Sequence, residues 1–336
     1  MTAVLPPRRW PLLALLLALL CNVALGAWQS QSEAIMGTQV NVTLWHPDDD
    51  VSQKAVAAVF AEMRRIDQTY SPYIDSSDLQ RINQHAAQSP QTISDEFYLL
   101  LDKSLFYSRV SNGAFDITFA SLGWKYDYRQ HQQPSEADRK ALLPAINYRW
   151  LQLNPQQRTV AFGHPNVRID LGGIAKGYAV DRAAALVTAL GVEHATISAG
   201  GDSRIIGDKM GKPWIVGIKN PRAESNTAPV IRLPLTDTAI STSGDYERYF
   251  IDQDSGERIH HIINPKTGRS ATGVMSVTIL GPVGIDTDPL STTVFVLGVD
   301  KGLELVNRLQ GIDCIIIDNA GKVHFSANLS PPEPSS

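Results

Sequence analysis

The stretch VRIDLGGIAKGYAVDRAAAL, residues 167–186, decides the fold because two periodicities meet in it. An apolar run ends at Asp170, two glycines follow, and a helical pattern begins at Lys176. Backbone N–H groups freed at Gly172 and Gly173 and at a helix start can receive phosphate oxygens, and Lys176 would add a positive charge. The alternative is a tight turn from strand to helix with a solvated lysine.

Around this stretch, helix and strand patterns are mixed rather than strictly alternating, which is typical of an α+β fold. The apolar spacing predicts helices over 51–70, 95–113, 176–190 and 289–308, with Ser94 as an N-cap and a break allowed at Gly298. Alternation predicts strands over 37–45, 167–171, 195–199, 214–219, 229–233, 246–252, 257–263 and 274–280, and hairpins over 150–163 and 313–325. We expect one domain of mixed sheets and packed helices over 27–328, followed by a disordered tail at 329–336.

The composition is that of an ordinary globular protein. The chain has 336 residues, of which 43% are hydrophobic and 19% charged, and its net charge is −4. Because there is no basic excess and no arginine-rich run, nucleic acid is not expected as a partner. Cys314 lies in the apolar run CIIID and is predicted to be an inert core residue.

The N-terminus has the pattern of a secretory signal. Two arginines precede the apolar run over 10–20, and small residues follow at 24 and 26. We predict a signal peptide over 1–26 and an exported, periplasmic mature chain. Cys21 raises the alternative of a lipid anchor, which the large Leu20 before it disfavours. After cleavage a single cysteine remains, so no intrachain disulfide is expected.

A second motif, DTDPLSTTVFVLG (286–298), offers oxygen ligands near a helix start. Pro289 at the first helical position would make Asp288 the N-cap. Thr292 lies four residues after Asp288, hence on the same face. A carboxylate with hydroxyls suits Mg²⁺, which favours oxygen ligands. The alternative is that Asp288 serves only as a helix cap.

A third motif, ISTSGDYERYFIDQDSGERIHHIINPKTG (240–268), combines a run of hydroxyls with adjacent histidines. In a strand, His260 and His261 point to opposite faces, so at most one serves a given site and the other is expected at the surface. A histidine beside a phosphate-binding site can act as a general base. The alternative is that both histidines are structural.

Taken in order along the chain, these motifs resemble the ApbE family, the FAD:protein FMN transferases formerly called thiamine-biosynthesis lipoproteins. The resemblance covers nearly the whole mature chain. It is carried by MGT (36–38), YSPYIDSSDLQRIN (70–83), GAFD (113–116), IDLGGIAKGYAVDRA (169–183), GGD (200–202), STSGDYERYF (241–250), HHIINPKTG (260–268) and DTDPLSTTVFVLG (286–298).

The resemblance implies a T-fold-related domain and an exported enzyme that uses FAD as substrate with Mg²⁺. Such enzymes transfer FMN to a threonine or serine hydroxyl of an acceptor protein and release AMP. Typical acceptors are subunits of membrane redox complexes, such as sodium-pumping NADH:quinone oxidoreductase, which also implies a possible association with the inner membrane. Two alternatives stay open: an exported FAD pyrophosphatase giving FMN and AMP, and a non-catalytic flavin-binding protein.

The resemblance also assigns roles to individual residues. It assigns FAD contacts to Met36, Tyr73, Ala114, Phe115, Asp116, Asp170, Lys176 and Ile263. It assigns the metal to Asp288, Ser291, Thr292 and the backbone carbonyl of Gly173, and the proton-accepting role to His261, whose pKa we expect to be unperturbed, at about 6.5. The chain departs from the family pattern at Asn264, where an aspartate is more usual, and at Pro289, where a small residue is common.

Overall fold

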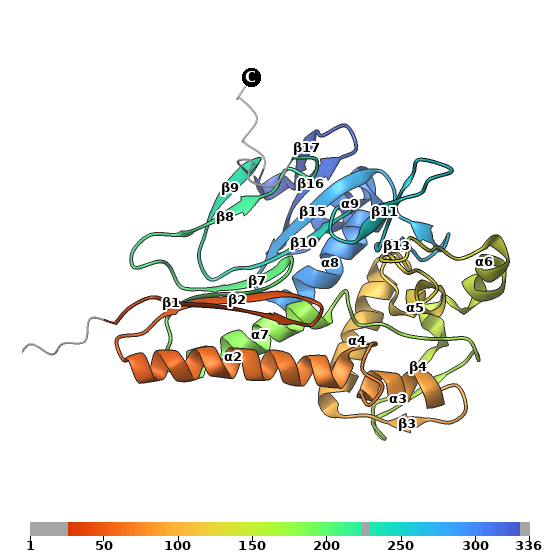
Figure 1. Cartoon of the computed structure of the whole chain (residues 1–336), viewed down its shortest axis with the longest axis horizontal. Coiled ribbons are helices and arrows are strands. Elements are labelled where there is room, and N and C mark those ends of the chain that lie inside the picture. Colours follow the sequence, from red (N-terminus) through yellow and green to blue (C-terminus); the bar gives the residue numbers. More distant parts are fainter. Residues whose placement is uncertain (1–25, 224–228, 330–336) are drawn as a thin grey trace, which may run out of the picture.

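The computed structural model describes residues 26–223 and 229–329, and Figure 1 shows their arrangement. Cys21 and the predicted signal peptide, apart from Gly26, lie outside the described residues. So does the predicted tail apart from Leu329, which lies in a short 3-10 turn, η4 (Ala327–Leu329), and packs partly buried. In the described part of the chain, no helix is both long enough and apolar enough to cross a membrane.

A large antiparallel sheet forms the centre of the described chain. Its eight strands follow the order β1-β2-β6-β7-β10-β15-β16-β17. In that order their bounds are Gln29–Ile35, Thr38–Trp45, His194–Ala199, Asp202–Ile206, Ala239–Gly244, Val274–Gly281, Asp313–Asp318 and Val323–Phe325. All of β15 is buried, while β2 buries alternate residues, Val40, Val42 and Leu44, as a strand with one face toward the core does. Cys314 is fully buried in β16, as predicted.

Four smaller sheets complete the strands of the described chain. Their members are β3 (Gln91–Thr92), β5 (Thr159–Phe162) and β4 (Leu151–Asn154); β8 (Trp214–Ile218) and β9 (Ile231–Leu235); β11 (Tyr249–Ile251) and β12 (Arg258–His260); and β13 (Ile263–Asn264) and β14 (Arg269–Ser270). The predicted strands over 229–233, 246–252 and 257–263 are thus displaced or shorter than expected, because turns interrupt the alternation.

Helices pack against the large sheet and beside it (Figure 1). The helices against it are α2 (Asp49–Tyr70), α7 (Ala175–Ala189), α8 (Gly284–Leu297) and α9 (Val299–Val306). Those beside it are α3 (Asp78–His85), α4 (Asp95–Val110), α5 (Ala120–Gly123) and α6 (Glu136–Leu142), with the 3-10 turns η1 (Ile117–Phe119), η2 (Leu143–Ala145) and η3 (Tyr148–Trp150). Mixed helices and antiparallel strands confirm the α+β class.

Two local predictions about helices are confirmed. Ser94 is the N-cap of α4, where its hydroxyl accepts a hydrogen bond from the Phe97 N–H at 3.1 Å. Gly298 separates α8 from α9 with φ at 78°, a conformation that a side chain disfavours.

The predicted strand over 167–171 is wrong, although its apolar residues are buried. Val167, Ile169 and Leu171 are each no more than 2% exposed, but the segment belongs to no sheet. The Asn83 side chain on α3 replaces a neighbouring strand: its amide accepts from the Ile169 N–H at 2.8 Å and donates to the Ile169 carbonyl at 2.9 Å. A side chain thus satisfies backbone groups that a sheet would otherwise pair.

The predicted start of the last long helix is also wrong. α8 begins at Gly284, with Val283 as its N-cap, so Pro289 lies inside the helix and Asp288 does not cap it. The Asp181 carboxylate of α7 supplies the cap instead, because it accepts from the Gly284 and Ile285 N–H groups, both at 2.8 Å. These are free N–H groups of a helix first turn, which need an acceptor.

Asp288 caps the other helix. Its Oδ2 accepts from the Gly177 N–H in the first turn of α7 at 2.9 Å. Each helix therefore caps its neighbour. The exchange depends on a close approach at Gly177 and Gly284, since a Cβ added at either glycine would overlap backbone atoms of the other. The Gly-Gly turn and the DTDPLSTT motif are brought together by this crossing.

We predict that Gly177→Ala destabilises the protein by at least about 2 kcal/mol, because the new methyl group would overlap the Gly284 carbonyl and lie 2.6 Å from the Asp288 Cβ. Urea unfolding followed by circular dichroism measures the change. Thr188→Ala, on the exposed face of the same helix, is the control and should change stability by less than about 0.5 kcal/mol. Equal stability of the two variants would contradict a tight crossing.

Candidate active site

An ion cluster lies where the first turn of α7 meets β7 and α8. Lys176 Nζ lies 2.9 Å from Asp202 Oδ2 and 3.6 Å from Asp288 Oδ2. The same ammonium donates to the Gly172 carbonyl at 2.9 Å. Asp202 and Asp288 are both buried, at 3% exposed each. Two carboxylates thus share one lysine in a place from which water is largely excluded.

The pKa values of this cluster follow from its burial and charge. Burial, followed by the charge of Asp202, raises the pKa of the Asp288 carboxyl. Burial alone would lower the pKa of Lys176, but the charges of Asp202 and Asp288 outweigh it and raise that pKa. Lys176 therefore stays charged. One lysine cannot balance two ionised carboxylates, and a further cation beside Asp288 would favour its ionised form.

Hydroxyl groups of two elements meet beside this cluster. Ser243 of β10 lies with its Oγ 2.8 Å from the Ser291 Oγ and 3.4 Å from the Thr292 Oγ1, both on α8. A Cβ built on Gly173 would lie 3.5 Å from the Thr292 Oγ1 and 3.2 Å from the Phe115 ring. The Gly-Gly turn therefore lies against the hydroxyl end of α8, and glycine leaves its main chain accessible there.

These groups fit a hard divalent cation. The donors are a carboxylate, hydroxyls and a main-chain carbonyl, all of them oxygen, and Mg²⁺ prefers such ligands. In residues 26–223 and 229–329, no three His, Cys, Asp or Glu side chains gather in a way that would hold a metal. A zinc-like site is therefore not formed in this region, and the metal assignment to Asp288, Ser291, Thr292 and Gly173 stays a prediction.

His261 lies at the bend after β12, where its Nδ1 is buried without a hydrogen-bond partner. Burial, reinforced by the positive charge of Arg248, lowers its pKa from 6.5 to about 3. The expectation of an unperturbed pKa is therefore wrong, because desolvation disfavours the imidazolium. His261 is neutral at pH 7 and is free to accept a proton.

The expectation that His260 lies at the surface is wrong, because this residue is only 3% exposed. Its Nε2 lies 2.8 Å from the Ala271 carbonyl, and its Nδ1 lies 3.3 Å from the Ile262 nitrogen. One neutral tautomer satisfies both, with Nε2–H donating and Nδ1 accepting. His260 thus holds the chain on either side of the bend that carries His261.

Four of the predicted FAD-contact residues lie in or beside the site. Lys176 belongs to the ion cluster, and Phe115 lies against Gly173. Asp170 Oδ1 accepts from the Gly172 N–H at 2.7 Å. Met36 occupies the β1–β2 turn with φ at 55°, and Arg248 donates to the carbonyl of the next residue at 3.1 Å.

The other four predicted FAD-contact residues have surroundings that differ from one to the next. Tyr73 is 82% exposed in the turn between α2 and α3, an unusual position for a large aromatic ring. Ala114 is buried. Asp116 is buried and accepts from the Thr118 N–H, the Thr118 hydroxyl and the Tyr148 N–H, so its carboxylate is occupied by structural bonds. The Ile263 side chain packs in a small cluster with Phe250 and other residues.

Three site residues had no role in the sequence predictions: Asp202, Ser243 and Arg248. Their motifs, GGD and STSGDYERYF, carried part of the resemblance. Two features of the sequence could have identified these residues: the carboxylate that directly follows two glycines in GGD, and the run of hydroxyl side chains in STSGDYERYF. Only the pairing of β7 with β10, which aligns Asp202 with Ser241, shows that these motifs adjoin.

Comparison with known proteins decides the family. The model of the ApbE family matches residues 36–316. This chain belongs to the ApbE family. It is 30% identical over 319 residues to the FAD:protein FMN transferase of Treponema pallidum (strain Nichols), covering 89% of this chain and 87% of the relative. It is 31% identical over 313 residues to the protein of the same name from Haemophilus influenzae, covering 87% and 89%.

Solved ApbE structures share the fold. The ApbE protein of Thermotoga maritima is 32% identical and superimposes with a TM-score of 0.81, over 90% of this chain and 98% of that one. The flavin transferase ApbE from Vibrio cholerae is 26% identical, with a TM-score of 0.80 and the same coverage. The α+β architecture of this ApbE-family chain is therefore that of the flavin transferases.

Because the pKa values of His260 and His261 are lowered in the folded protein, we predict that its free energy of unfolding depends on pH. Below pH 6.5 the unfolded chain binds protons at His260 and His261, whereas folded His261 resists protonation down to about pH 3. Protonation therefore favours unfolding, and stability falls as the pH decreases through this window. Between pH 7 and pH 5, His261→Gln should lose roughly 1–2 kcal/mol less stability than the wild type.

Urea unfolding at both pH values measures this difference. His85→Gln, at an exposed position on α3, is the control and should retain the wild-type pH dependence. The same acid sensitivity in His261→Gln as in the wild type would show that His261 is not held neutral.

Proposed function

We propose that this chain is an FAD:protein FMN transferase that attaches FMN to a hydroxyl of an acceptor protein and releases AMP. The observation that carries the proposal is the meeting of the Gly-Gly turn, Lys176 and the oxygen groups of α8 at one place in an ApbE-family chain. FAD and a protein acceptor are named for its relatives.

Residues of the site match the parts of FAD. The exposed Tyr73 ring is available to stack on a flat aromatic system, as the isoalloxazine is. The pyrophosphate needs cations and N–H donors. Lys176 and Arg248 would supply the cations, and Gly173 an N–H, since the Gly172 N–H already donates to Asp170. Because glycine lacks a Cβ, phosphate oxygens can approach this turn closely.

Asp288, Ser291, Thr292 and the Gly173 carbonyl would hold Mg²⁺. When bound, the ion supplies charge neutralisation at the pyrophosphate. Asp202 keeps Lys176 charged and in place beside this set, through the contact at 2.9 Å. Lys176 is thereby positioned between the anionic side chains and the anionic substrate.

The transfer needs one proton acceptor. A bond forms between the acceptor oxygen and the FMN phosphorus, the bond from that phosphorus to the AMP oxygen breaks, and the hydroxyl proton leaves. His261 is neutral and takes this proton. Its low pKa makes it a weak base in the protein alone, but anionic phosphate oxygens beside it would raise that pKa. No covalent enzyme intermediate is required.

We further propose that the chain acts in the periplasm, on a subunit of a membrane redox complex. The apolar run after two arginines at the N-terminus supports export, with Cys21 as the alternative of a lipid anchor. A soluble domain of such a subunit, carrying its threonine or serine, is the natural first acceptor for a test.

A flavinylation assay tests the proposal. The mature chain (27–336) is mixed with FAD, Mg²⁺ and the acceptor domain, with and without a chelator. We expect covalent flavin fluorescence on the acceptor in a denaturing gel, equimolar AMP, and loss of both with the chelator. Free FMN and AMP with no label on any acceptor would instead identify a pyrophosphatase. Absence of FAD cleavage would leave flavin binding alone.

His261→Gln should lower the transfer rate constant at least about 100-fold, because it removes the proton acceptor, while FAD affinity changes little. Stopped-flow transfer and fluorescence titration of FAD measure the two quantities. His85→Gln is the matched control, and a wild-type rate in His261→Gln would exclude His261 as the base.

Asp288→Asn should abolish Mg²⁺-stimulated transfer while keeping an oxygen to accept from Gly177, so the helix pair is preserved. The measurement is the rate against Mg²⁺ concentration. Asp300→Asn, an exposed carboxylate on α9, should keep the wild-type curve. An unchanged dependence of the rate on Mg²⁺ in Asp288→Asn would show that Asp288 serves only as the cap of α7.

A further inference from the structure

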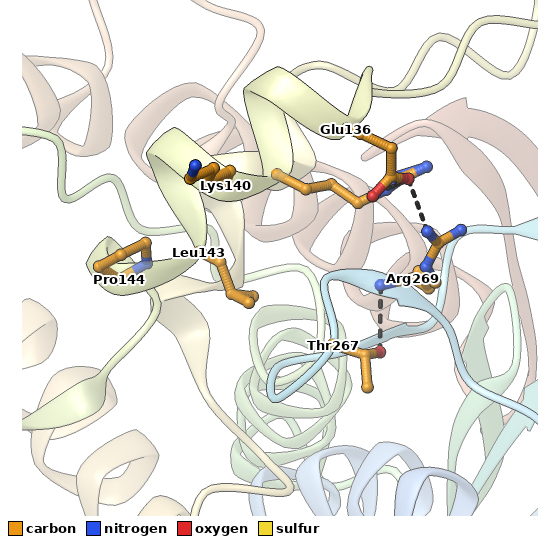
Figure 2. Close-up of a pocket in the computed structure, with 7 residues that line it drawn as sticks. Glu136, Lys140, Leu143, Pro144, Thr267 and Arg269 are labelled. Atoms are coloured by element: carbon orange, nitrogen blue, oxygen red, sulfur yellow. Dashed lines mark hydrogen bonds and ion pairs between the residues drawn. The ribbon is translucent and has the colours of Figure 1, made fainter.

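A pocket of about 500 Å³ lies outside the site described above, between α6 and η2 on one side and the β13–β14 hairpin on the other. We call it the basic pocket. Figure 2 shows Lys140 and Arg269 on opposite sides of it, with Leu143 between them. Its lining residues are Glu136, Arg139, Lys140, Leu143, Pro144, Thr267 and Arg269.

The charges of this pocket are not balanced. Glu136 provides the one carboxylate among the residues that line the pocket. Its Oε1 accepts from Arg139 Nε at 3.2 Å and from Arg269 Nη2 at 2.6 Å. Lys140 is exposed and forms no ion pair with any described residue. Three cations therefore surround one anion, and the pocket has a surplus of two positive charges.

Arg139 adds a second, independent observation. It is 6% exposed, and its Nη1 is buried without a hydrogen-bond partner, while Nη2 donates to Gln133 at 3.0 Å. A buried guanidinium is costly unless its donors are satisfied. Beside it, Leu143 and Pro144 give the pocket an apolar wall. Such a pocket suits the carboxylate side chain of a peptide.

The basic pocket is joined to the His261 segment by main-chain and side-chain bonds. The Ser270 hydroxyl accepts from the His260 N–H at 2.9 Å and donates to the His260 carbonyl at 2.7 Å. Arg269 pairs with Asn264, three residues after His261. A pair spacing of about 5.5 Å plus three residues of about 3.5 Å puts their Cα atoms within roughly 16 Å.

We propose that the basic pocket docks an acidic segment of the acceptor protein, and so fixes the acceptor hydroxyl at His261. The proposal rests on the proposed function. An extended chain rises about 3.3 Å per residue. The aspartate or glutamate that enters the pocket therefore lies within about five residues of the modified threonine or serine.

The test is a charge reversal at the two exposed cations, Lys140→Glu with Arg269→Glu. With the acceptor domain that the wild type labels, we expect KM for the acceptor to rise at least tenfold. The FAD dissociation constant and the rate at saturating acceptor should change less than twofold. Lys301→Glu with Arg308→Glu, exposed cations on α9 and in the turn that follows it, is the matched control. An unchanged KM in the pocket variant would overturn the proposal.

Two further measurements keep the test decisive. Lys140→Gln with Arg269→Gln removes charge more gently and should give a smaller rise in KM, provided that both variants melt like the wild type. An acceptor whose acidic residues near the modified site are changed to lysine should bind poorly to the wild type and regain affinity for the charge-reversed enzyme. Failure of this rescue would also overturn docking by charge.

A third readout separates the two proposals. Fluorescence anisotropy of a labelled hexaglutamate peptide measures docking without transfer. Binding of the peptide by the wild type, and at least tenfold weaker binding by the charge-reversed variant, would support the docking role of the basic pocket. If no acceptor were labelled in the transfer assay, only the transferase proposal would then fail. Equal binding by both proteins would reject the pocket whatever the transfer assay shows.

Discussion

The candidate site depends on the reciprocal capping of α7 and α8. Each helix lends a carboxylate to the free N–H groups of the other: Asp181 to Gly284 and Ile285, and Asp288 to Gly177. Helix N-termini are positive, so both carboxylates lie where the helix dipole stabilises them. The exchange requires two glycines at the crossing. It explains why a glycine stands at position 177 and at position 284, and why each helix carries a buried carboxylate beside the crossing.

Much of the fold was predictable because it is local. The helix over 51–70 and the Ser94 cap were read correctly from apolar spacing and a capping residue. The segment 167–171 was not, since its burial looked like a strand but Asn83, more than eighty residues away, replaced the sheet. The start of α8 was misjudged for a similar reason, because the cap was supplied by Asp181 on another helix. Local patterns do not show which distant group satisfies a backbone N–H.

The residues of the candidate site also divide into those that local sequence identifies and those that depend on distant partners. The Gly-Gly turn, Asp288 and Thr292 were each identifiable from residue type and spacing, and the structure brings them together. Asp202 and Arg248 were missed because their partners come from β-strand pairing and a turn far along the chain. The character of the two histidines was also out of reach, since it depends on desolvation by surrounding elements. His260 shapes the bend, while burial and the charge of Arg248 keep His261 neutral.

Lys176 has a consequence for the order of assembly. Its ammonium already lies between Asp202, Asp288 and the Gly172 carbonyl, so the chain itself balances one of the two carboxylate charges. In many metal sites, like charges repel until the ion arrives, and folding waits for it. Here the lysine is an internal counter-ion. The helix pair is therefore held by groups of the chain alone, and the proposed Mg²⁺ would bind at a site that is already formed rather than drive its folding.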